Sequence, residues 1–427
     1  MPHPPALARP ISWRFFAGIL PVVAPRKHWT GGRRLICGSG PVLGLAAALA
    51  AVLAAVLAAA GCASAPAQTG GRPGPAAGTS ASGRPSPPAI TAAHARQVFD
   101  RYVAAAASPT ASHPASPLHS LVTGVERAVL TATLASHSVT SNGTASTGQG
   151  AYRSSLTVKP ALDVYTYGSP TFYVPEAAGY PRFFVASVTR TLPAAIPAAD
   201  GTATGPDGSD VPADGPVLML FSQASAGAPW LLASNSRLPA GVTLPKLATD
   251  SAGYIPTVPL SDAALLAQPD NAGPLQAAVV DDGPSSTATK AVATGPLTTG
   301  LYSGVRNHVD GMTAPPGDVY QWELDGSSLP EFALRTAAGG ALVFYAMTQT
   351  TTVAVPDVIN KADPIHPGPP IQVPLAVKML LPVGQPDPLV QLSSEQLLSF
   401  AAIDPAKGNA KLEVIAIGGG LTSASAS

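Results

Sequence analysis

The sequence contains very little cysteine and few charged residues. Its two cysteines, Cys37 and Cys62, both lie within the first 62 of 427 residues, and only 11 % of the chain is charged, against a usual ~25 %. The rest of the chain therefore has no internal disulfide and no cysteine-based metal site. Its fold must be stabilised by burial of apolar side chains, for which a chain of this length is sufficient.

Acidic residues are missing from the amino-terminal part of the chain. Residues 1–61 hold six of the 24 basic residues and no acidic one, so removing them leaves 18 basic against 24 acidic residues, a net charge of −6. A mildly acidic protein with scattered charges has no field with which to bind a phosphate backbone, and we therefore predict no nucleic-acid partner.

A run of twenty residues without charge, from Pro41 to Ala60, follows two pairs of basic residues. This order is typical of an export signal, although twenty residues also suffice for a retained membrane anchor. The small residues Ala59-Ala60-Gly61 directly before Cys62 favour cleavage, because lipoprotein signal peptidase accepts such a sequence. We expect residues 1–61 to be a lipoprotein signal peptide, and Cys62 to be lipidated and held on the extracytoplasmic face of the cell membrane. Both the general and the twin-arginine export routes remain open.

Two segments have the composition of disordered polypeptide. Residues 62–89 are rich in Ala, Pro, Gly and Ser, which predicts a flexible tether between the lipid anchor and the first packed element. The tail at residues 418–427 begins with three consecutive glycines, and its composition predicts disorder.

The body between these segments has the pattern of an α+β protein. Thr91 is a good helix N-cap, and the apolar residues that follow it share one helical face: Ala95, Val98, Phe99, Tyr102 and Val103. A second helical stretch is expected from Pro117 to about Ala135. Short β-branched and aromatic runs then predict antiparallel strands at 163–167, 172–174, 182–191, 217–222 and 230–236. Helices followed by such strands indicate helices packed on one face of an antiparallel sheet.

The second half of the body repeats the order of the first. The clearest echo is Asp163-Val164-Tyr165 with Asp318-Val319-Tyr320, and the others are His137 with His308, 181–183 with 330–332, and 217–221 with 341–345. We therefore expect two halves built from a duplicated unit that resembles the nuclear-transport-factor-like or cystatin-like cone. The alternative is one larger sheet shared by both halves.

These echoes suggest boundaries for the two halves. We expect a first α+β domain at residues 90–238 and a second at 275–417. The Pro-rich residues 239–274 would form an exposed connection between them, with a short helix at 261–267 and few contacts crossing it.

Six segments of the chain carry a resemblance to a known family. They are the lipobox at Cys62, the helix ARQVFDRYV, the strands TYGSPTFYVP and YPRFFVAS, the strand start Pro229-Trp230, and FALRTAAGGALVFYAM. In these segments the chain resembles a family of uncharacterised actinobacterial lipoproteins, and the resemblance covers most of residues 90–420. It implies an exported lipoprotein of unknown function and supplies no catalytic residues.

The body lacks the common motifs of catalysis and cofactor binding. It has no serine-nucleophile motif of the G-x-S-x-G or S-x-x-K type, no phosphate-binding G-x-x-x-x-G-K loop and no H-E-x-x-H. The densest acidic cluster lacks the alternating spacing of a calcium loop and favours a solvated loop: Asp200, Asp207, Asp210 and Asp214. We therefore predict no catalytic residue, no metal site and no cofactor.

Four residues are candidates for a concave binding face. His137 and His308 recur in both halves just before the sheet, where a histidine could bind a ligand or move a proton. The simpler interpretation is a polar residue at a helix end. Tyr165 and Tyr320 could line a pocket, although aromatic residues at alternating strand positions more often form the core.

These observations predict an exported, lipid-anchored protein of the cell envelope. We expect a non-catalytic binding or structural module whose concave face binds a protein or a small apolar ligand. The alternative is an envelope hydrolase or isomerase with a small concave site, using isolated groups such as His137, Asp163 or Tyr320, because one fold can host many functions.

Overall fold

The structure is a computed structural model. It describes residues 88–108, 116–147, 150–158, 165–176, 179–191, 215–307, 319–354, 371–386, 390–408 and 410–427, all within one compact unit, Ser82–Ser427. The expected signal peptide, Cys62 and almost all of the expected tether lie outside the described residues. So do His308, Asp163 and the acidic cluster at 200–214.

The first half begins with the expected helix, α1 (Ala92–Ala106), in which Ala95, Phe99 and Tyr102 are buried. The side chain of its N-cap, Thr91, accepts a hydrogen bond from the His94 N–H at 3.2 Å. A 3₁₀ turn, η1 (Pro117–Leu121), and helix α2 (Gly124–Ala135) replace the single second helix expected from the sequence. A hairpin of β1 (Val139–Thr147) and β2 (Gly150–Val158) follows.

The strands of the first half match the expected ones closely. They are β3 (Thr166–Tyr167), β4 (Thr171–Tyr173), β5 (Arg182–Thr191), β6 (Gly215–Gln223) and β7 (Leu231–Arg237).

The second half follows a similar plan. Its helical part comprises η2 (Pro269–Asn271), α3 (Ala272–Asp282), η3 (Gly283–Ser285), η4 (Thr287–Lys290) and α4 (Thr299–Arg306). Its strands are β8 (Val319–Gly326), β9 (Phe332–Arg335), β10 (Ala341–Ala354), β11 (Gln391–Asp404) and β12 (Glu413–Ala426), with the one-turn helix α5 (Leu375–Lys378) before β11.

Both halves contribute to one antiparallel sheet of ten strands. Its order is β3-β5-β6-β7-β12-β11-β10-β8, while β4 pairs with β5 and β9 pairs with β10. The halves join where β7 meets β12, with Arg237 opposite Ile417. The α+β class is therefore confirmed, and the halves share one sheet, which was the alternative left open by the sequence.

The strand order is the same when it is read inward from either edge of the sheet. β3, β5, β6 and β7 correspond in this way to β8, β10, β11 and β12. A similar backbone hydrogen bond is found ahead of the strands in each half. The Thr123 N–H donates to the Leu232 carbonyl in the first half, and the Ala293 N–H donates to the Leu412 carbonyl in the second, both at 2.8 Å. These parallels favour the expected duplication, which stays a prediction.

Two of the expected echoes do not occupy corresponding places. Residues 217–221 lie in β6, whereas residues 341–345 lie in β10, the counterpart of β5. Phe183 and Phe332 contact each other, with ring centroids 4.5 Å apart, instead of occupying equivalent positions. The pairing of these segments was wrong because every buried strand contains a run of apolar residues. Two such runs match by composition alone, whether or not they occupy corresponding strands.

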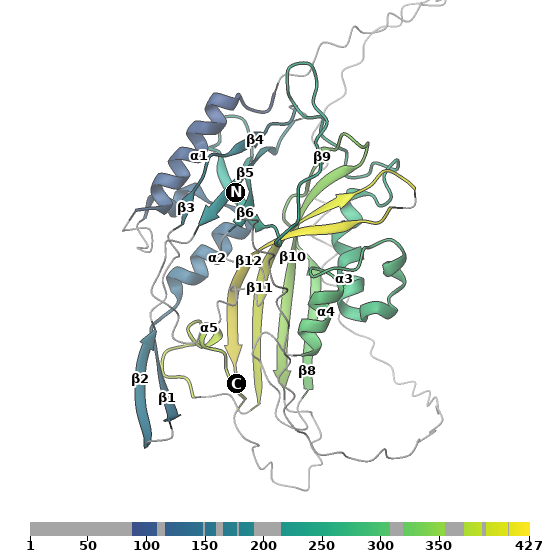
Figure 1. The fold of residues 1–427 in the computed structure, drawn as a ribbon. Helices are drawn as coiled ribbons and strands as arrows, with labels where there is room; N and C mark the ends of the chain where they lie inside the picture. Colours follow the sequence, from purple (N-terminus) through teal and green to yellow (C-terminus); the bar gives the residue numbers. More distant parts are fainter. Residues whose placement is uncertain are drawn as a thin grey trace, which may run out of the picture. The chain divides into compact units, whose positions relative to one another are not determined.

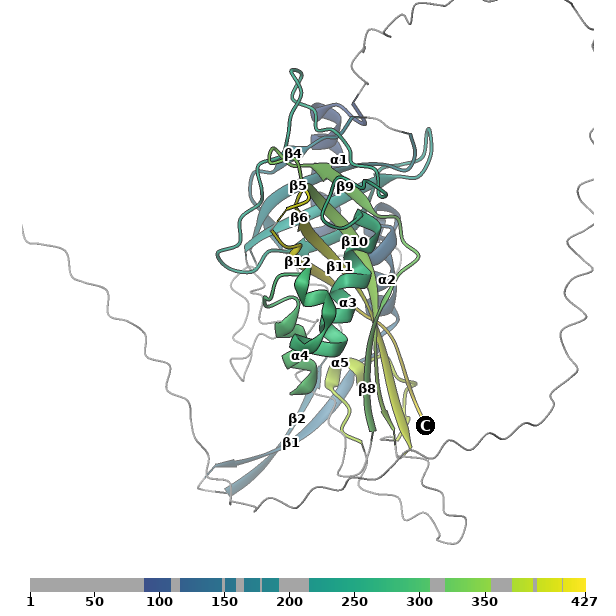
Figure 2. The ribbon, with the colours of Figure 1, turned by 90° about the vertical axis from the view of Figure 1, so that its right-hand side faces the viewer.

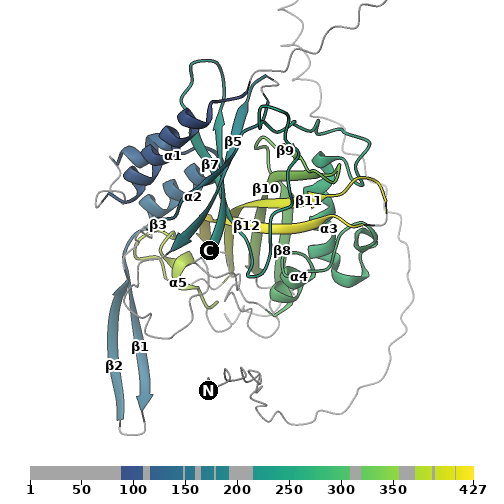
Figure 3. The ribbon, with the colours of Figure 1, turned by 45° about the horizontal axis from the view of Figure 1, so that its top comes forward.

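The two parts of the sheet face each other, with the helices outside them. Phe183 and Val185 of β5 share one buried cluster with Leu342 and Phe344 of β10. Alternate residues, such as Phe184 on β5, point the other way and pack against α1. Figure 1 shows α1 and α2 on one side of the sheet and α3 and α4 on the other, and Figure 2 shows α3 and α4 in front of the strands. In Figure 3, β5 and β7 cross the direction of β11 and β12.

The segment expected to be an exposed connection is packed into the core instead. Leu247, Ile255, Val258 and Leu265 are buried. The segment is held by backbone hydrogen bonds to both halves, from Ile255 N–H to the Val174 carbonyl and from Val258 N–H to the Ala333 carbonyl, each at 3.0 Å. Frequent prolines exclude helix, and the chain satisfies its polar backbone on the strands beside it.

The prediction of a short helix at residues 261–267 is also wrong. The segment forms turns, in which the Asp262 carboxylate accepts a hydrogen bond from the Ala264 N–H at 2.9 Å and forms an ion pair with Arg335. An aspartate that binds a backbone N–H two residues ahead stabilises a turn in competition with a helix.

The tail expected to be disordered is a strand, since β12 continues to Ala426. Its glycines are required by close packing: a Cβ at Gly418 would overlap the carbonyl oxygen of Asn235, and one at Gly419 would overlap that of Leu397. Glycine in a strand often marks such a close approach of another backbone, and composition alone cannot distinguish it from disorder.

Candidate functional site

A cavity of about 270 Å³ lies in the first half, between the helices and the sheet. Elements α1, η1 and α2 form one wall, and β3, β5, β7 and β12 form the other. Its volume is just below the ~300–1,000 Å³ typical of small-molecule sites. Apolar side chains such as Leu118 and Val129 line it together with eight polar ones: Tyr102, Glu126, Thr133, Tyr165, Tyr167, Arg190, Asn235 and Arg237.

Helix and strand periodicity place these side chains on the two walls. Glu126, Val129, Leu130 and Thr133 have the i, i+3, i+4, i+7 spacing that puts residues on one helical face. On the sheet, Tyr165 and Tyr167 are two residues apart, as are Asn235 and Arg237, so each pair shares a face of its strand. Tyr167 lies directly opposite Arg190 in the pairing of β3 with β5.

Glu126 is the acidic group of the cavity. Burial raises the pKa of its carboxyl group from the usual 4.5 to about 7, although Arg190 and a hydrogen bond from the backbone of Asn235 oppose this shift. Near neutral pH the carboxyl is therefore present in both protonation states. The protonated form can donate a hydrogen bond, the ionised form can accept one, and the group can transfer a proton.

Two tyrosines and two arginines complete the polar lining of the cavity. The hydroxyls of Tyr102 and Tyr167 are hydrogen-bonded to each other, and burial raises the pKa of Tyr167 to about 12 and that of Tyr102 well above its usual value. Both hydroxyls therefore stay protonated near neutral pH, and because one donates to the other, only one O–H of the pair can donate elsewhere. Arg190 is only 6 % exposed, and its guanidinium lies 3.9 Å from the ring centroid of Tyr165. Arg237 is equally buried.

The four residues expected on a concave face do not lie together in the structure's cavity. Tyr165 lies in the wall of the cavity. His137 follows α2, and its N–H donates to the Met379 carbonyl at 3.0 Å, away from the residues that line the cavity. Tyr320 packs against an apolar cluster with Val353 at the other edge of the sheet. His308 lies outside the described residues.

Sequence reasoning missed Glu126, Arg190 and Arg237. Glu126 carried a usable signal, since it lies four residues from both Val122 and Leu130 on the apolar face of the second helical stretch. A carboxylate on an apolar face is rarely buried without a partner or a function. The arginines carried no comparable signal, because alternating polar residues on a strand usually face water.

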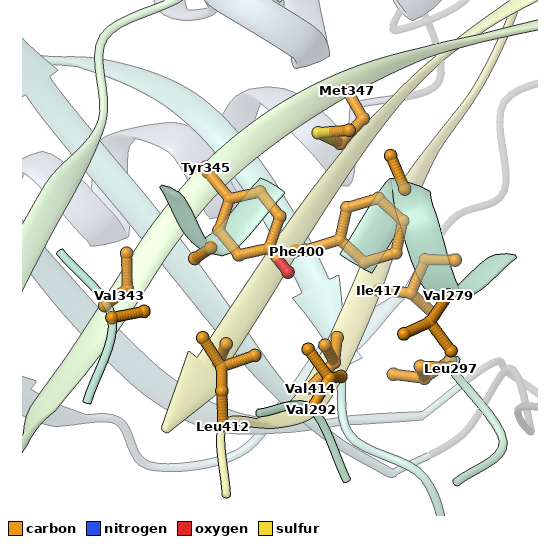
Figure 4. Close-up of a cluster of buried hydrophobic side chains, with 14 of the residues drawn as sticks. Val279, Val292, Leu297, Val343, Tyr345, Met347, Phe400, Leu412, Val414 and Ile417 are labelled. Atoms are coloured by element: carbon orange, nitrogen blue, oxygen red, sulfur yellow. The ribbon is translucent and has the colours of Figure 1, made fainter. Parts of the chain in front are cut away.

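In the second half, apolar side chains fill the corresponding space. Figure 4 shows Tyr345 and Phe400 beside each other. Their rings stack with centroids 5.6 Å apart, much as Phe184 stacks on Phe221 at 4.8 Å in the first half. Val279, Leu297 and Val414 close the space around them. The Tyr345 hydroxyl donates to the Gln276 side-chain oxygen at 2.8 Å, and the Gln276 amide donates to the Leu297 carbonyl at 2.8 Å.

Strand pairing locates the difference between the halves. Arg190 lies opposite Tyr167 in the first half, whereas Thr351 lies opposite Trp322 in the corresponding strands of the second. The charged groups thus belong to the first half alone at these positions, and we take its cavity as the candidate functional site.

Two searches over the described residues concern metals and membranes. Within the described ranges, no group of three or more His, Cys, Asp or Glu side chains is placed to hold a metal ion. In the same part of the chain, no helix combines the length and the apolar character that crossing a bilayer requires.

The fold and the cavity define an α+β protein with a polar cavity between the helices and the sheet of its first half. Residues 86–426 match a family described as a domain of unknown function, DUF8094. The chain belongs to this family. No curated protein and no solved structure matches the chain.

Proposed function

We propose that the protein is an exported, lipid-anchored protein of the cell envelope that binds a small ligand in the cavity between α1, α2 and the sheet. The observation that carries the binding role is the cavity itself, in which Glu126, Arg190 and the Tyr102–Tyr167 pair lie among apolar side chains. The export signal, the lipobox at Cys62 and the resemblance to actinobacterial lipoproteins support the location.

The composition of the cavity supports binding over a purely structural role. The side-chain oxygen of Asn235 is buried without a hydrogen-bond partner, and such a group costs ~1–3 kcal/mol of stability. A layer that served stability alone would consist mainly of apolar side chains, as the corresponding layer of the second half does. A few converging polar groups in an otherwise apolar cavity are typical of a ligand site.

A matched pair of substitutions on α1 tests the binding role. Ala106 lines the cavity and Ala104 is exposed on the same helix, so Ala106→Phe fills the cavity while Ala104→Phe controls for the added ring. With anilinonaphthalene sulfonate as a fluorescent probe, we expect saturable binding to the wild type and to Ala104→Phe, and its loss in Ala106→Phe. Absence of saturable binding, or equal binding by both variants, would contradict the proposal.

One observation favours a second function, an isomerase or hydrolase of the envelope. A carboxyl group whose pKa is about 7 is suited to general acid–base catalysis at neutral pH, and the remaining O–H of the tyrosine pair could stabilise a developing oxyanion. In an enzyme, Glu126→Gln would abolish turnover of a substrate while leaving its binding in place. In a binding protein, the same substitution would change only affinity.

A further inference from the structure

A second cavity, of about 290 Å³, lies where the two halves meet. The first half contributes Pro175, Glu176 and residues 179–183, and the second contributes residues 331–333, while residues 257–260 of the connecting segment close it. Its apolar surface includes Phe183 and Phe332, whose ring centroids are 4.5 Å apart. This cavity shares no lining residue with the cavity of the first half.

Two side chains of opposite charge line this cavity with unsatisfied atoms. The Nε of Arg182 and one carboxylate oxygen of Glu331 are buried, and neither has a hydrogen-bond partner. The guanidinium of Arg182 packs over the ring of Tyr180, 4.6 Å from its centroid, which fixes its position without satisfying its N–H. A buried charged group that lacks a partner costs stability.

The two side chains do not satisfy each other. No ion pair joins Arg182 and Glu331, although both line the same cavity. Burial raises the pKa of the Glu331 carboxyl, and the neighbouring Asp270 raises it further. A positive charge next to Glu331 would therefore be favourable. An anionic group next to Arg182 would accept from its buried, unsatisfied Nε–H.

We propose that this cavity binds a small zwitterion of the amino-acid class. Arg182 would donate to its carboxylate, and Glu331 would accept from its ammonium group. A carboxylate matches the planar donor geometry of a guanidinium, an ammonium group supplies three donors, and the rings of Phe183 and Phe332 offer an apolar surface for a side chain.

Ligands with a single charge fit the cavity less well. A simple anion would leave Glu331 without a partner and would face a second carboxylate, that of Glu176. A simple cation would leave Arg182 unsatisfied. Among the described residues that line the cavity, Arg182 carries the only positive charge, so a molecule that carries both charges is the class that pairs both unsatisfied atoms.

The test uses the full chain and a charge-matched set of probes. Each common α-amino acid is titrated by calorimetry at millimolar concentration, and the strongest binder is compared with its N-acetyl derivative, which lacks the ammonium charge, and its amide, which lacks the carboxylate. We expect the zwitterion to bind and each derivative to bind at least ~tenfold more weakly, since each loses one charged hydrogen bond. Binding by no amino acid, or equal binding of the derivatives, would overturn the proposal and indicate a cavity filled by water only.

Three variants complete the test. Arg182→Gln and Glu331→Gln should each weaken binding of the zwitterion, whereas Glu395→Gln makes the same chemical change at an exposed residue outside the cavity and should bind within a few-fold of the wild type. Without ligand, Glu331→Gln should melt at an equal or higher temperature than the wild type, because it removes an unpaired buried charge. A lower melting temperature would assign Glu331 a structural role instead.

The Ala106→Phe variant should bind the amino acid normally, which separates this site from the first cavity.

Discussion

The carboxyl group of Glu126 makes the stability of the protein depend on pH in a way that can be calculated. Raising its pKa from 4.5 to about 7 corresponds to about 3 kcal/mol, since each tenfold change in proton affinity is worth ~1.4 kcal/mol. The folded state holds the proton more tightly than the unfolded state does. Its stabilising effect is therefore complete below pH 4.5 and is lost as the pH rises to about 7 and above.

The substitution Glu126→Gln removes this dependence while keeping the shape of the side chain. We expect the variant and the wild type to differ little in free energy of unfolding near pH 4.5, and the variant to be the more stable of the two at pH 8, by up to about 3 kcal/mol. Urea unfolding of both proteins at each pH measures the difference, and the contributions of all other groups cancel because each comparison is made at one pH.

A second variant controls for the change in net charge. Glu395 is exposed on β11, so Glu395→Gln makes the same chemical change outside the cavity. If the difference between Glu126→Gln and the wild type is the same at both pH values, the Glu126 carboxyl is not desolvated, and the electrostatic description of the cavity is wrong.

Three further predictions concern the anchor, the core and the sheet. Cys62→Ser should lose a metabolically incorporated fatty-acid label and its membrane fraction, and equal labelling would refute lipidation. Phe99→Ala should lower the free energy of unfolding by ~3–5 kcal/mol, because Phe99 packs edge-on against Tyr167 and Phe172 with centroids 6.1 and 6.0 Å away; an unchanged urea midpoint would mean that α1 is peripheral. Gly418→Ala should severely impair folding, because the added Cβ would overlap the Asn235 carbonyl oxygen. In Gly420→Ala the added Cβ meets only the Val129 side chain, at 3.3 Å, so a circular-dichroism melt of both variants should show that Gly420→Ala is tolerated better.

The candidate site was predictable only in part, because its polar groups come from segments far apart in the chain. The apolar face of α1, including Tyr102, follows from periodicity alone, and Tyr165 was expected on a concave face. The partners that give the cavity its chemistry, Glu126 and Arg190, come together only when α2 packs on the sheet. Burial, which shifts the pKa of Glu126, is a property of that packing and of no single segment.

What the sequence by itself determined is local. Thr91 begins α1, alternating β-branched and aromatic residues form β5 to β7, and helices followed by strands make an α+β protein, because caps and periodicity act over a few residues. Only the tertiary structure decided that both halves share one sheet, that the Pro-rich segment is buried between them, and that Gly418 lies in a strand. Each of these outcomes depends on a backbone partner distant in sequence. Without the backbone of β7 beside the glycines and that of β9 beside the Pro-rich segment, the same residues would be typical of a loop.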